Sequence, residues 1–489
     1  MSHAVWDHLR FQTRLRPHAL AIYGAAGPVT YRALAHDVDA LATELMQRGL
    51  SRQDLVGLHL DLSYLHLLLI LALDRLSIPS MSFPSPGPLP PAAILRQQLD
   101  LTAMVSAAAE PVDPPCRWLQ MAGQERPRLG TPDQTWLAQL DSPADCLVRV
   151  GWSSGSTGGV KGSPITRILQ GHRIAARRLA RALGPRTRYL TGVPFSSAPG
   201  YVMPLAVLAA GGVVILRGAG ADFVELANAL RATMTSGPPA LLAELVGDDR
   251  GPARRLETVE LFMVSGTHLP GQLAREARLR LTPNIWIGYG ATETDGVAIA
   301  DSAVGIADPT AVGYLFPWVE AETVDAAGRP LPVGGEGTLR LRCAQMIAGY
   351  YKDAAATARN FRDGWFYPGD VGAITGQGLL RITGRIEDVI LRDGVSLLPL
   401  PIEEAIRGFP GVRDVAVFAL TGADGGPTIC AALVLEPGTA PQAVQAFAAA
   451  QLGDRAPTRL FVIDSLPRNA SGKVLRRQLV QRAAQAVRP

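Results

Sequence analysis

Residues 150–164, VGWSSGSTGGVKGSP, combine glycines and hydroxyl side chains with a single lysine, Lys161. Glycine lets the backbone adopt positive φ and approach a ligand closely. Consecutive free N–H groups in such a turn form a concave anion site, and hydroxyls and a lysine add donors that suit phosphate oxygens. The stretch therefore predicts a short phosphate-binding loop that ends in Lys161. The alternative is a flexible glycine- and serine-rich loop without a ligand.

Two other motifs are close to this stretch. A Walker A loop requires G-x-x-x-x-G-K-[ST], whereas Lys161 follows Val160 and precedes Gly162. The segment GWSSG does fit the G-x-S-x-G nucleophile elbow of α/β-hydrolases, with Ser153 as the nucleophile. A serine hydrolase is therefore a second hypothesis, and only His172 and His268 follow the serine as candidate bases.

The composition is that of an ordinary globular protein. A length of 489 residues predicts two or three domains, and the net charge of +4 comes without a basic run that would indicate nucleic-acid binding. Four widely separated cysteines argue against a disulfide framework or a zinc site and fit a reducing cytoplasm. The apolar run at 62–73 is too short to span a bilayer. We expect a cytoplasmic protein without a membrane span.

Lysine is unusually rare in this chain. Among 47 basic residues only Lys161, Lys352 and Lys473 are lysines, and arginine supplies the other cations. Lys161 and Lys473 lie in glycine-rich segments, which indicates that a compact ammonium group is required there. We interpret Lys352 as a surface charge.

Helical and strand patterns alternate along most of the chain and change towards its end. This alternation predicts a layered α/β domain, followed by a β-rich lobe over 320–375. The pattern after residue 388 predicts a small α+β domain. We place the domains at 1–384 and 385–489. The expected elements include helices 34–48, 62–76, 168–183, 201–210, 223–234, 401–408, 441–451 and 474–486, strands 55–60, 213–216, 261–264, 285–288, 414–419, 428–435 and 459–463, and loops over 107–143.

Six short segments resemble, in their order, the motifs of the adenylate-forming superfamily of acyl- and aryl-CoA synthetases and adenylation domains. They read SSGSTGGVKG, YGATE, GYY, GWFYPGD, GRIEDVI and PRNASGK. The resemblance implies that ATP and a carboxylic acid form an acyl-adenylate and pyrophosphate, and that the acyl group then passes to the thiol of CoA. It also implies a large N-terminal domain and a small mobile C-terminal domain joined at a hinge, which by motif match is Glu387. A stand-alone enzyme that loads the phosphopantetheine arm of a separate carrier protein is the alternative, and a decayed relative is a minor one.

The resemblance assigns a role to individual residues by motif match. Thr292 would contact the α-phosphate and Glu293 would hold Mg²⁺, while Lys473 would bridge the carboxylate and the α-phosphate. The β- and γ-phosphates fall to Ser154, Gly155, Ser156, Thr157, Gly158 and Lys161. The nucleoside and thiol sites comprise Tyr289 and Gly290 at the adenine, the backbone of Ser265, Gly266 and Thr267 along its edge, Asp370 and Arg385 at the ribose, and Gly394 beside the pantetheine tunnel.

Four positions depart from the usual pattern of that superfamily. Val160 replaces a proline, Leu391 a lysine and Pro401 a glutamate, while Ser197 stands where a histidine, or the aspartate of α-amino-acid domains, is common. The missing aspartate argues against an α-amino acid as substrate. The pocket-lining candidates are small or apolar, which favours an uncharged acyl or aryl body. They are Ser197, Val264, Gly288 and Gly290.

Overall fold

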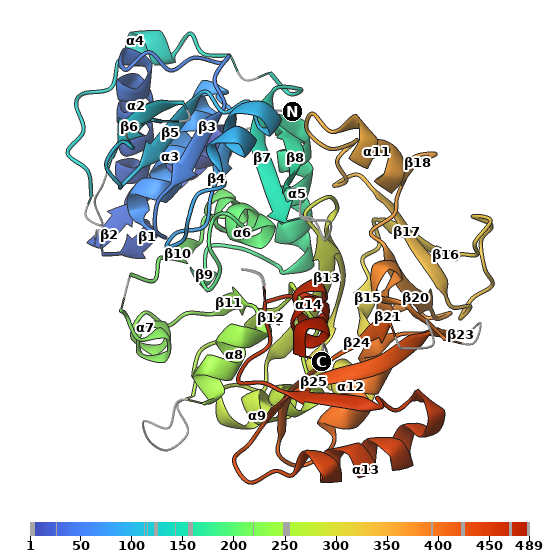
Figure 1. The fold of residues 1–489 in the computed structure, drawn as a ribbon. Helices are drawn as coiled ribbons and strands as arrows, with labels where there is room; N and C mark the ends of the chain where they lie inside the picture. The colour runs from blue at the N-terminus through green and yellow to red at the C-terminus, as the bar shows by residue number, and fades with distance from the viewer. Residues whose placement is uncertain are drawn as a thin grey trace.

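A computed structural model describes the chain apart from short gaps. The described residues are 5–25, 27–111, 113–114, 116–121, 126–141, 143–154, 160–218, 220–247, 255–392, 395–421, 426–468 and 472–486. Two sheets, with helices packed against them, form most of the fold (Figure 1). Among these residues, no helix has both the length and the apolar character needed to cross a bilayer.

The larger sheet changes from parallel to antiparallel along its width. Its parallel part runs in the order β13-β12-β11-β9-β10-β1, and β2 closes that edge antiparallel to β1. These strands are β1 (Leu20–Gly24), β2 (Gly27–Thr30), β9 (Arg188–Leu190), β10 (Val213–Ile215), β11 (Met234–Gly237), β12 (Leu261–Val264) and β13 (Ile285–Ala291). The antiparallel part begins with β14 (Asp295–Asp301) and continues through β15 (Ala311–Leu315), β16 (Val319–Val324), β17 (Gly337–Cys343), β18 (Phe361–Arg362), β19 (Trp365–Phe366), β20 (Asp370–Ile374) and β21 (Leu379–Arg385). The β-rich lobe expected over 320–375 falls within this part, which begins earlier, at β14, and ends later, at β21.

The second sheet has six strands in the order β6-β5-β3-β4-β7-β8. They are β3 (Val56–His59), β4 (Ser80–Ser82), β5 (Ala103–Ser106), β6 (Arg117–Gln120), β7 (Leu147–Ser154) and β8 (Val160–Thr166). All neighbours are parallel except β7 and β8, which form an antiparallel hairpin. The hairpin carries the glycine-rich segment.

Five helices join the two sheets through one apolar core, because their buried side chains pack with strands of both. They are α1 (Val5–Leu15), α2 (Tyr31–Gln47), α3 (Tyr64–Leu76), α5 (Arg167–Ala180) and α6 (Ala198–Ala209). Thr30 and Ser63 cap α2 and α3 by accepting bonds from backbone N–H groups. A second core lies between the parallel strands and the helices α7 (Phe223–Ala229), α8 (Pro239–Val246) and α9 (Gly271–Arg280), and α10 (Ser302–Ala307) packs beside α9.

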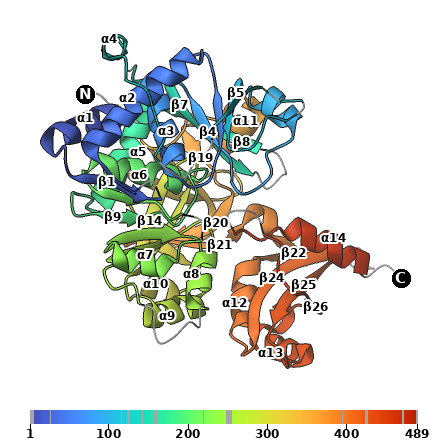
Figure 2. The same cartoon turned by 90° about the vertical axis from the view of Figure 1, so that its left-hand side faces the viewer.

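The C-terminal elements form a separate small α+β unit, as expected. Its sheet β24-β25-β26 is covered by helices on both sides (Figure 2). Its elements are β22 (Ile390–Arg392), β23 (Val395–Leu397), α12 (Pro399–Arg407), β24 (Val412–Thr421), β25 (Pro427–Leu435), α13 (Pro441–Leu452), β26 (Arg459–Val462) and α14 (Arg476–Ala486). The fold class is thereby confirmed, while the domain boundary near residue 384 stays a prediction.

Three expectations about single elements were wrong. The helix predicted over 223–234 ends at Ala229, because Arg231 has a φ of 51° and β11 begins at Met234. The segment 107–143 holds β6 and the short helix α4 (Gln134–Leu137) in addition to loops. Strand β13 continues to Ala291, so Tyr289 and Gly290 lie in a strand rather than in the loop after it.

Candidate active site

The β7–β8 hairpin contains the two described parts of the predicted phosphate-binding segment, residues 150–154 in β7 and 160–164 in β8. Ser153 lies opposite Lys161 in the register of the two strands, so Lys161 belongs to β8 and not to the loop in which we expected it. The backbone of Ser154 ends β7. Gly155, Ser156, Thr157 and Gly158 lie outside the described residues.

The same hairpin contradicts the hydrolase hypothesis. A nucleophile elbow is a sharp turn between a strand and a helix, whereas Ser153 lies inside β7 and is paired with β8. Both candidate bases make other contacts. A ring nitrogen of His172 is 3.2 Å from the carbonyl oxygen of Ala344, and Nε2 of His268 is 3.0 Å from a carboxylate oxygen of Glu404.

Glu293 and Lys161 approach each other across the ring of Tyr350. The hydroxyl of Tyr350 donates to Oε1 of Glu293 at 2.7 Å, and Nζ of Lys161 is 4.9 Å from the centre of the same ring. Lys161 also donates to Oδ1 of Asn360 at 3.4 Å. The segment containing Tyr350 thus connects the β7–β8 hairpin to the turn between β13 and β14. Sequence reasoning noted GYY as a motif but gave Tyr350 no role.

Close backbone packing explains two glycines of this region. A Cβ on Gly151 would lie 3.2 Å from the methyl group of Thr292, so the hairpin and the Thr292 turn approach each other tightly. A Cβ on Gly290 would lie 2.1 Å from the carbonyl oxygen of Asp295. Gly290 is therefore required by the pairing of β13 with β14, which is a structural reason for its size besides the expected role beside a ligand.

Asp370 is a buried carboxylate held by Tyr289 and Arg385. The Tyr289 hydroxyl donates to Oδ2, and Nη1 of Arg385 is 3.0 Å from Oδ1. The register of β20 and β21 sets Asp370 opposite Arg385. Burial raises the pKa of Asp370 although Arg385, the Tyr289 hydrogen bond and the charge of Lys473 act in the other direction. The Nε atom of Arg385 is buried without a hydrogen-bond partner among the described atoms.

Lys473 lies beside the same cluster. Its Nζ donates to Oε1 of Glu387 at 3.3 Å, and Nη2 of Arg385 is 3.7 Å from that carboxylate oxygen. A Cβ on Gly472 would lie 3.7 Å from the methyl group of Thr267, which places the lysine segment against the predicted adenine-edge loop of Ser265, Gly266 and Thr267. The structure therefore brings Tyr289, Asp370, Arg385 and Lys473 together at one place.

The structure describes some, but not all, of the four departures from the superfamily pattern and of the other residues with an expected role. Ser197 caps α6 by accepting from the N–H of Gly200 at 3.1 Å, and it donates to the carbonyl of Pro194. Val264 is buried in the second core, and Leu391 is exposed near the predicted hinge. The side chain of Val160 and the residue Gly394 lie outside the description, and nothing in the structure explains Pro401.

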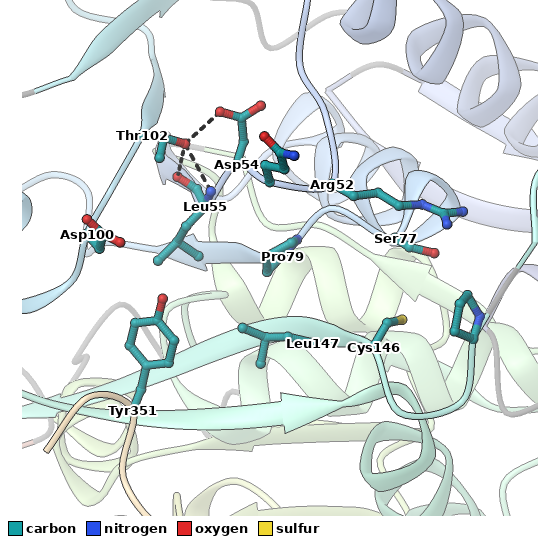
Figure 3. A pocket seen from close by; sticks show the side chains of 12 residues that line it. Arg52, Asp54, Leu55, Ser77, Pro79, Asp100, Thr102, Cys146, Leu147 and Tyr351 are labelled. Carbon is teal, nitrogen blue, oxygen red and sulfur yellow. Dashed lines mark hydrogen bonds between the residues drawn. The ribbon is translucent and has the colours of Figure 1, made fainter. Parts of the chain in front are cut away.

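Figure 3 shows a cavity of about 310 Å³ that none of these residues lines. It is lined by residues at the N-terminal ends of β3, β5 and β7, among them Leu55, Thr102 and Leu147. The glycine-rich segment begins at the opposite end of β7. Tyr351 lines the cavity and is next in sequence to Tyr350, but the cavity does not belong to the candidate site.

Comparison with known proteins gives consistent similarities. Residues 9–351 match the family described as AMP-binding enzyme, and residues 401–473 match the AMP-binding enzyme C-terminal domain. A fatty acid–[acyl-carrier-protein] ligase, ScoC of Streptomyces coeruleorubidus, is 31% identical over 266 residues, which are 53% of this chain and 51% of that protein. Feruloyl-CoA synthase of an Amycolatopsis species is 26% identical over 491 residues, covering 96% of this chain and 97% of the synthase. The crystal structure of ATP-bound MatB from Rhodopseudomonas palustris superposes with a TM-score of 0.87 at 25% identity, with both chains fully covered.

Proposed function

Because the chain belongs to the family of AMP-binding enzymes, we propose that it activates a carboxylic acid with ATP and transfers the acyl group to the thiol of CoA. The first step releases pyrophosphate and leaves an acyl-adenylate. The observation that carries this proposal is the convergence of Lys473, Arg385 and Asp370 from both parts of the chain at one place. A cytoplasmic location, as expected from the sequence, is part of the proposal.

The charges of the site suit the first step. A carboxylate that attacks the α-phosphate brings two anions together, so positive charges and N–H donors must offset the repulsion. Lys473 is the cation we assign to this contact, and Thr292 is the residue of the large domain that we assign to the α-phosphate. Lys161 and the glycine-rich segment are assigned to the β- and γ-phosphates.

The nucleoside is assigned to the cluster around Asp370. An ionised aspartate accepts hydrogen bonds from two ribose hydroxyls, and Arg385 holds the carboxylate while one of its own donors stays unpaired. Tyr289 would lie against the adenine ring, with the Ser265–Thr267 loop along the edge. Gly290 would let the base approach the backbone.

We assign a magnesium ion to Glu293. Glu293 is 9% exposed, and within the described part of the chain the Tyr350 hydroxyl donates to one oxygen of its carboxylate, so oxygen lone pairs are left for a hard cation. Within the described ranges, no group of three or more His, Cys, Asp or Glu side chains converges on a point. Phosphate oxygens of ATP and water would therefore supply the remaining ligands. When bound, the ion would offset the negative charge of the phosphates.

The acceptor of the acyl group is CoA in the leading proposal. The relatives named above include a CoA synthase and a carrier-protein ligase, so loading of a separate carrier protein stays the second candidate. In either case the small domain, residues 385–489, would rotate about Glu387 after adenylation. Lys473 would leave the site, and the segment around Gly394 would border the thiol arm.

The acid substrate is proposed to have an uncharged acyl or aryl body. The departure at Ser197 removes both the gating histidine and the aspartate that would pair with an α-amino group. The relatives act, by their names, on a fatty acid and on ferulic acid, which are both acids of this kind.

The test is pyrophosphate–ATP exchange across aryl, short-chain, medium-chain and β-amino acids. Exchange with one class, lost in Lys473→Ala, supports adenylation and identifies the acid. The active acid is then supplied with CoA, or with a phosphopantetheinylated carrier protein, and thioester formation is measured. Wild-type protein that binds no ATP would contradict the proposal.

A further inference from the structure

Helix α5 packs against the turn that carries Thr292 and Glu293, because Arg173 on this helix contacts the backbone of both residues. Arg173 and Arg177 are one helical turn apart, so they lie on the same face of the helix, and both side chains are buried. Arg173 has no exposed surface. Neither residue belongs to a motif discussed above.

Arg173 binds the backbone of the turn. Its Nη2 donates to the carbonyl oxygens of Thr292 at 3.0 Å and of Glu293 at 3.1 Å, and its Nε donates to the carbonyl of Gln345 at 3.0 Å. The N–H of Ile347 donates to the same Glu293 oxygen at 2.9 Å. One guanidinium group therefore holds both peptide carbonyls of the two residues assigned to the α-phosphate and the metal ion.

Arg177 holds the other end of the turn through Asp295. Its Nε donates to Oδ2 at 2.9 Å, and its Nη2 donates to Oδ1, so the pair is bidentate. Asp295 has a φ of 62°, which is uncommon for a residue with a side chain. Burial opposes ionisation of Asp295, but Arg177, Arg173 and Arg181 together lower its pKa. Arg173 thus holds the turn at Thr292 and Glu293, and Arg177 holds it two residues later at Asp295.

This arrangement is costly as a way of filling a core. Each buried charge loses its hydration, and well-packed apolar side chains often serve stability as well or better. The hydrogen bonds of Arg173 go to three carbonyl oxygens and not to a carboxylate, while its Nη1 is buried without a partner among the described atoms. What the guanidinium adds, which an apolar side chain could not, is the fixed direction of these peptide groups.

We propose that Arg173 is a positioning residue for adenylation, which sets the Thr292–Glu293 turn for Mg²⁺ and the α-phosphate, and that the Arg177–Asp295 pair fixes the same turn. This inference rests on the proposed function. It predicts an effect on magnesium–nucleotide binding and on the adenylation rate, and none on the affinity for the acid.

The experiment compares Arg173→Met and Arg173→Lys with Gln170→Met. Gln170 is a matched control because it is fully buried on the same helix, and its amide donates to Asp74 and lies within hydrogen-bond distance of Tyr201, away from the turn. The fluorescent nucleotide mant-ATP is titrated at several Mg²⁺ concentrations, which requires no knowledge of the acid. The number of competent sites is obtained from the stoichiometry, and pyrophosphate exchange per competent site is measured with the acid found above.

We expect Arg173→Met to slow exchange per site by about 100-fold, since misplacement of a reacting group by about 1 Å has effects of this order. The Mg²⁺ concentration for half-maximal binding should rise, Arg173→Lys should be intermediate, and Gln170→Met should resemble the wild type per competent site. A merely structural role would instead lower the number of competent sites in both Met variants and leave rate and Mg²⁺ dependence per site unchanged. That result would overturn the inference alone, whereas a wild type that binds no Mg²⁺–mant-ATP would overturn the proposed function as well.

Discussion

The two halves of the candidate site are held in different ways. In the large-domain half, the Arg177–Asp295 pair has side chains that are 9% and 3% exposed, and Arg173 is fully buried. In the other half, the Lys473–Glu387 pair is 36% and 32% exposed. His268 and Glu404, which connect the Ser265–Thr267 loop to α12, are 25% and 16% exposed.

This difference indicates which half can move during a catalytic cycle. Breaking a buried ion pair leaves an uncompensated charge and costs about 3–5 kcal/mol, whereas an exposed pair contributes about 0–1 kcal/mol. Exposed pairs such as Lys473–Glu387 can therefore be broken and formed again in every turnover. The fixed half would therefore set the geometry for the nucleotide, and the weakly held half would deliver and withdraw Lys473.

The largest effect is expected from Lys473→Ala. Removing a preorganised cation from the attack on the α-phosphate should slow pyrophosphate exchange by about 100-fold or more. Thioester formation from an added acyl-adenylate should change far less, because we propose that Lys473 leaves the site for that step. Arg477→Ala is the control, since Arg477 is an exposed cation on α14. An equal loss of rate in pyrophosphate exchange and in thioester formation would contradict a role of Lys473 in the first step alone.

A smaller, pH-dependent effect is expected at Asp370. Burial raises the pKa of this carboxyl, so it binds its proton at a higher pH than an ordinary aspartate. In the proposed role the ionised carboxylate accepts hydrogen bonds from the ribose hydroxyls, so mant-ATP binding should weaken as the pH falls through this raised pKa. The free energy of unfolding changes with pH in the opposite direction. Because the pKa of Asp370 is higher in the folded protein than in the unfolded chain, its contribution to stability becomes less favourable as the pH rises above the pKa of the unfolded chain. Asp370→Asn should weaken binding at neutral pH and remove this pH dependence, and an unchanged profile would contradict the assignment.

Tyr350→Phe should have a moderate effect on the fixed half. Losing the hydroxyl removes one hydrogen bond to a charged group, worth about 1.5–3 kcal/mol, and leaves the ring beside Lys161. We expect the Mg²⁺ concentration for half-maximal exchange to rise roughly ten-fold. The melting temperature should change by no more than a few degrees. Tyr367→Phe serves as the control, because Tyr367 contacts Arg340 and Arg362 rather than Glu293. Identical kinetics of both variants would exclude a role for the Tyr350 hydroxyl.

The smallest effect is expected from Glu404→Gln. The carboxylate is held ionised by its contacts, because the His268 hydrogen bond and Arg407 lower its pKa against the effect of burial. Weakening this partly exposed contact should slow adenylation by about two- to five-fold and leave thioester formation unchanged or faster. The effect should decrease at high ionic strength. Glu44→Gln, which breaks a surface pair with Arg48 on α2, should change neither step.

Local motifs predicted much of the fold, and the roles that they assign to single site residues stay predictions. Periodicity located most elements, and Asp370 and Arg385 were correctly expected together, since the register of β20 and β21 makes them neighbours. Arg173 could not be found in this way. Its partner Thr292 is 119 residues away, and on α5 alone a buried arginine cannot be distinguished from a surface one. The structural reason for Gly290 could not be predicted from the sequence either. Its small size permits a close backbone contact with Asp295 that exists only once β13 and β14 are paired.

The Arg177–Asp295 pair has a consequence for how the family can diverge. A substitution of either residue alone leaves a buried, unpaired charge next to the Thr292–Glu293 turn, so single exchanges at these positions would be eliminated quickly. Descendants of this chain should therefore keep both residues or replace both within one short evolutionary interval. A simultaneous exchange of both residues would identify the lineages in which other side chains hold the turn.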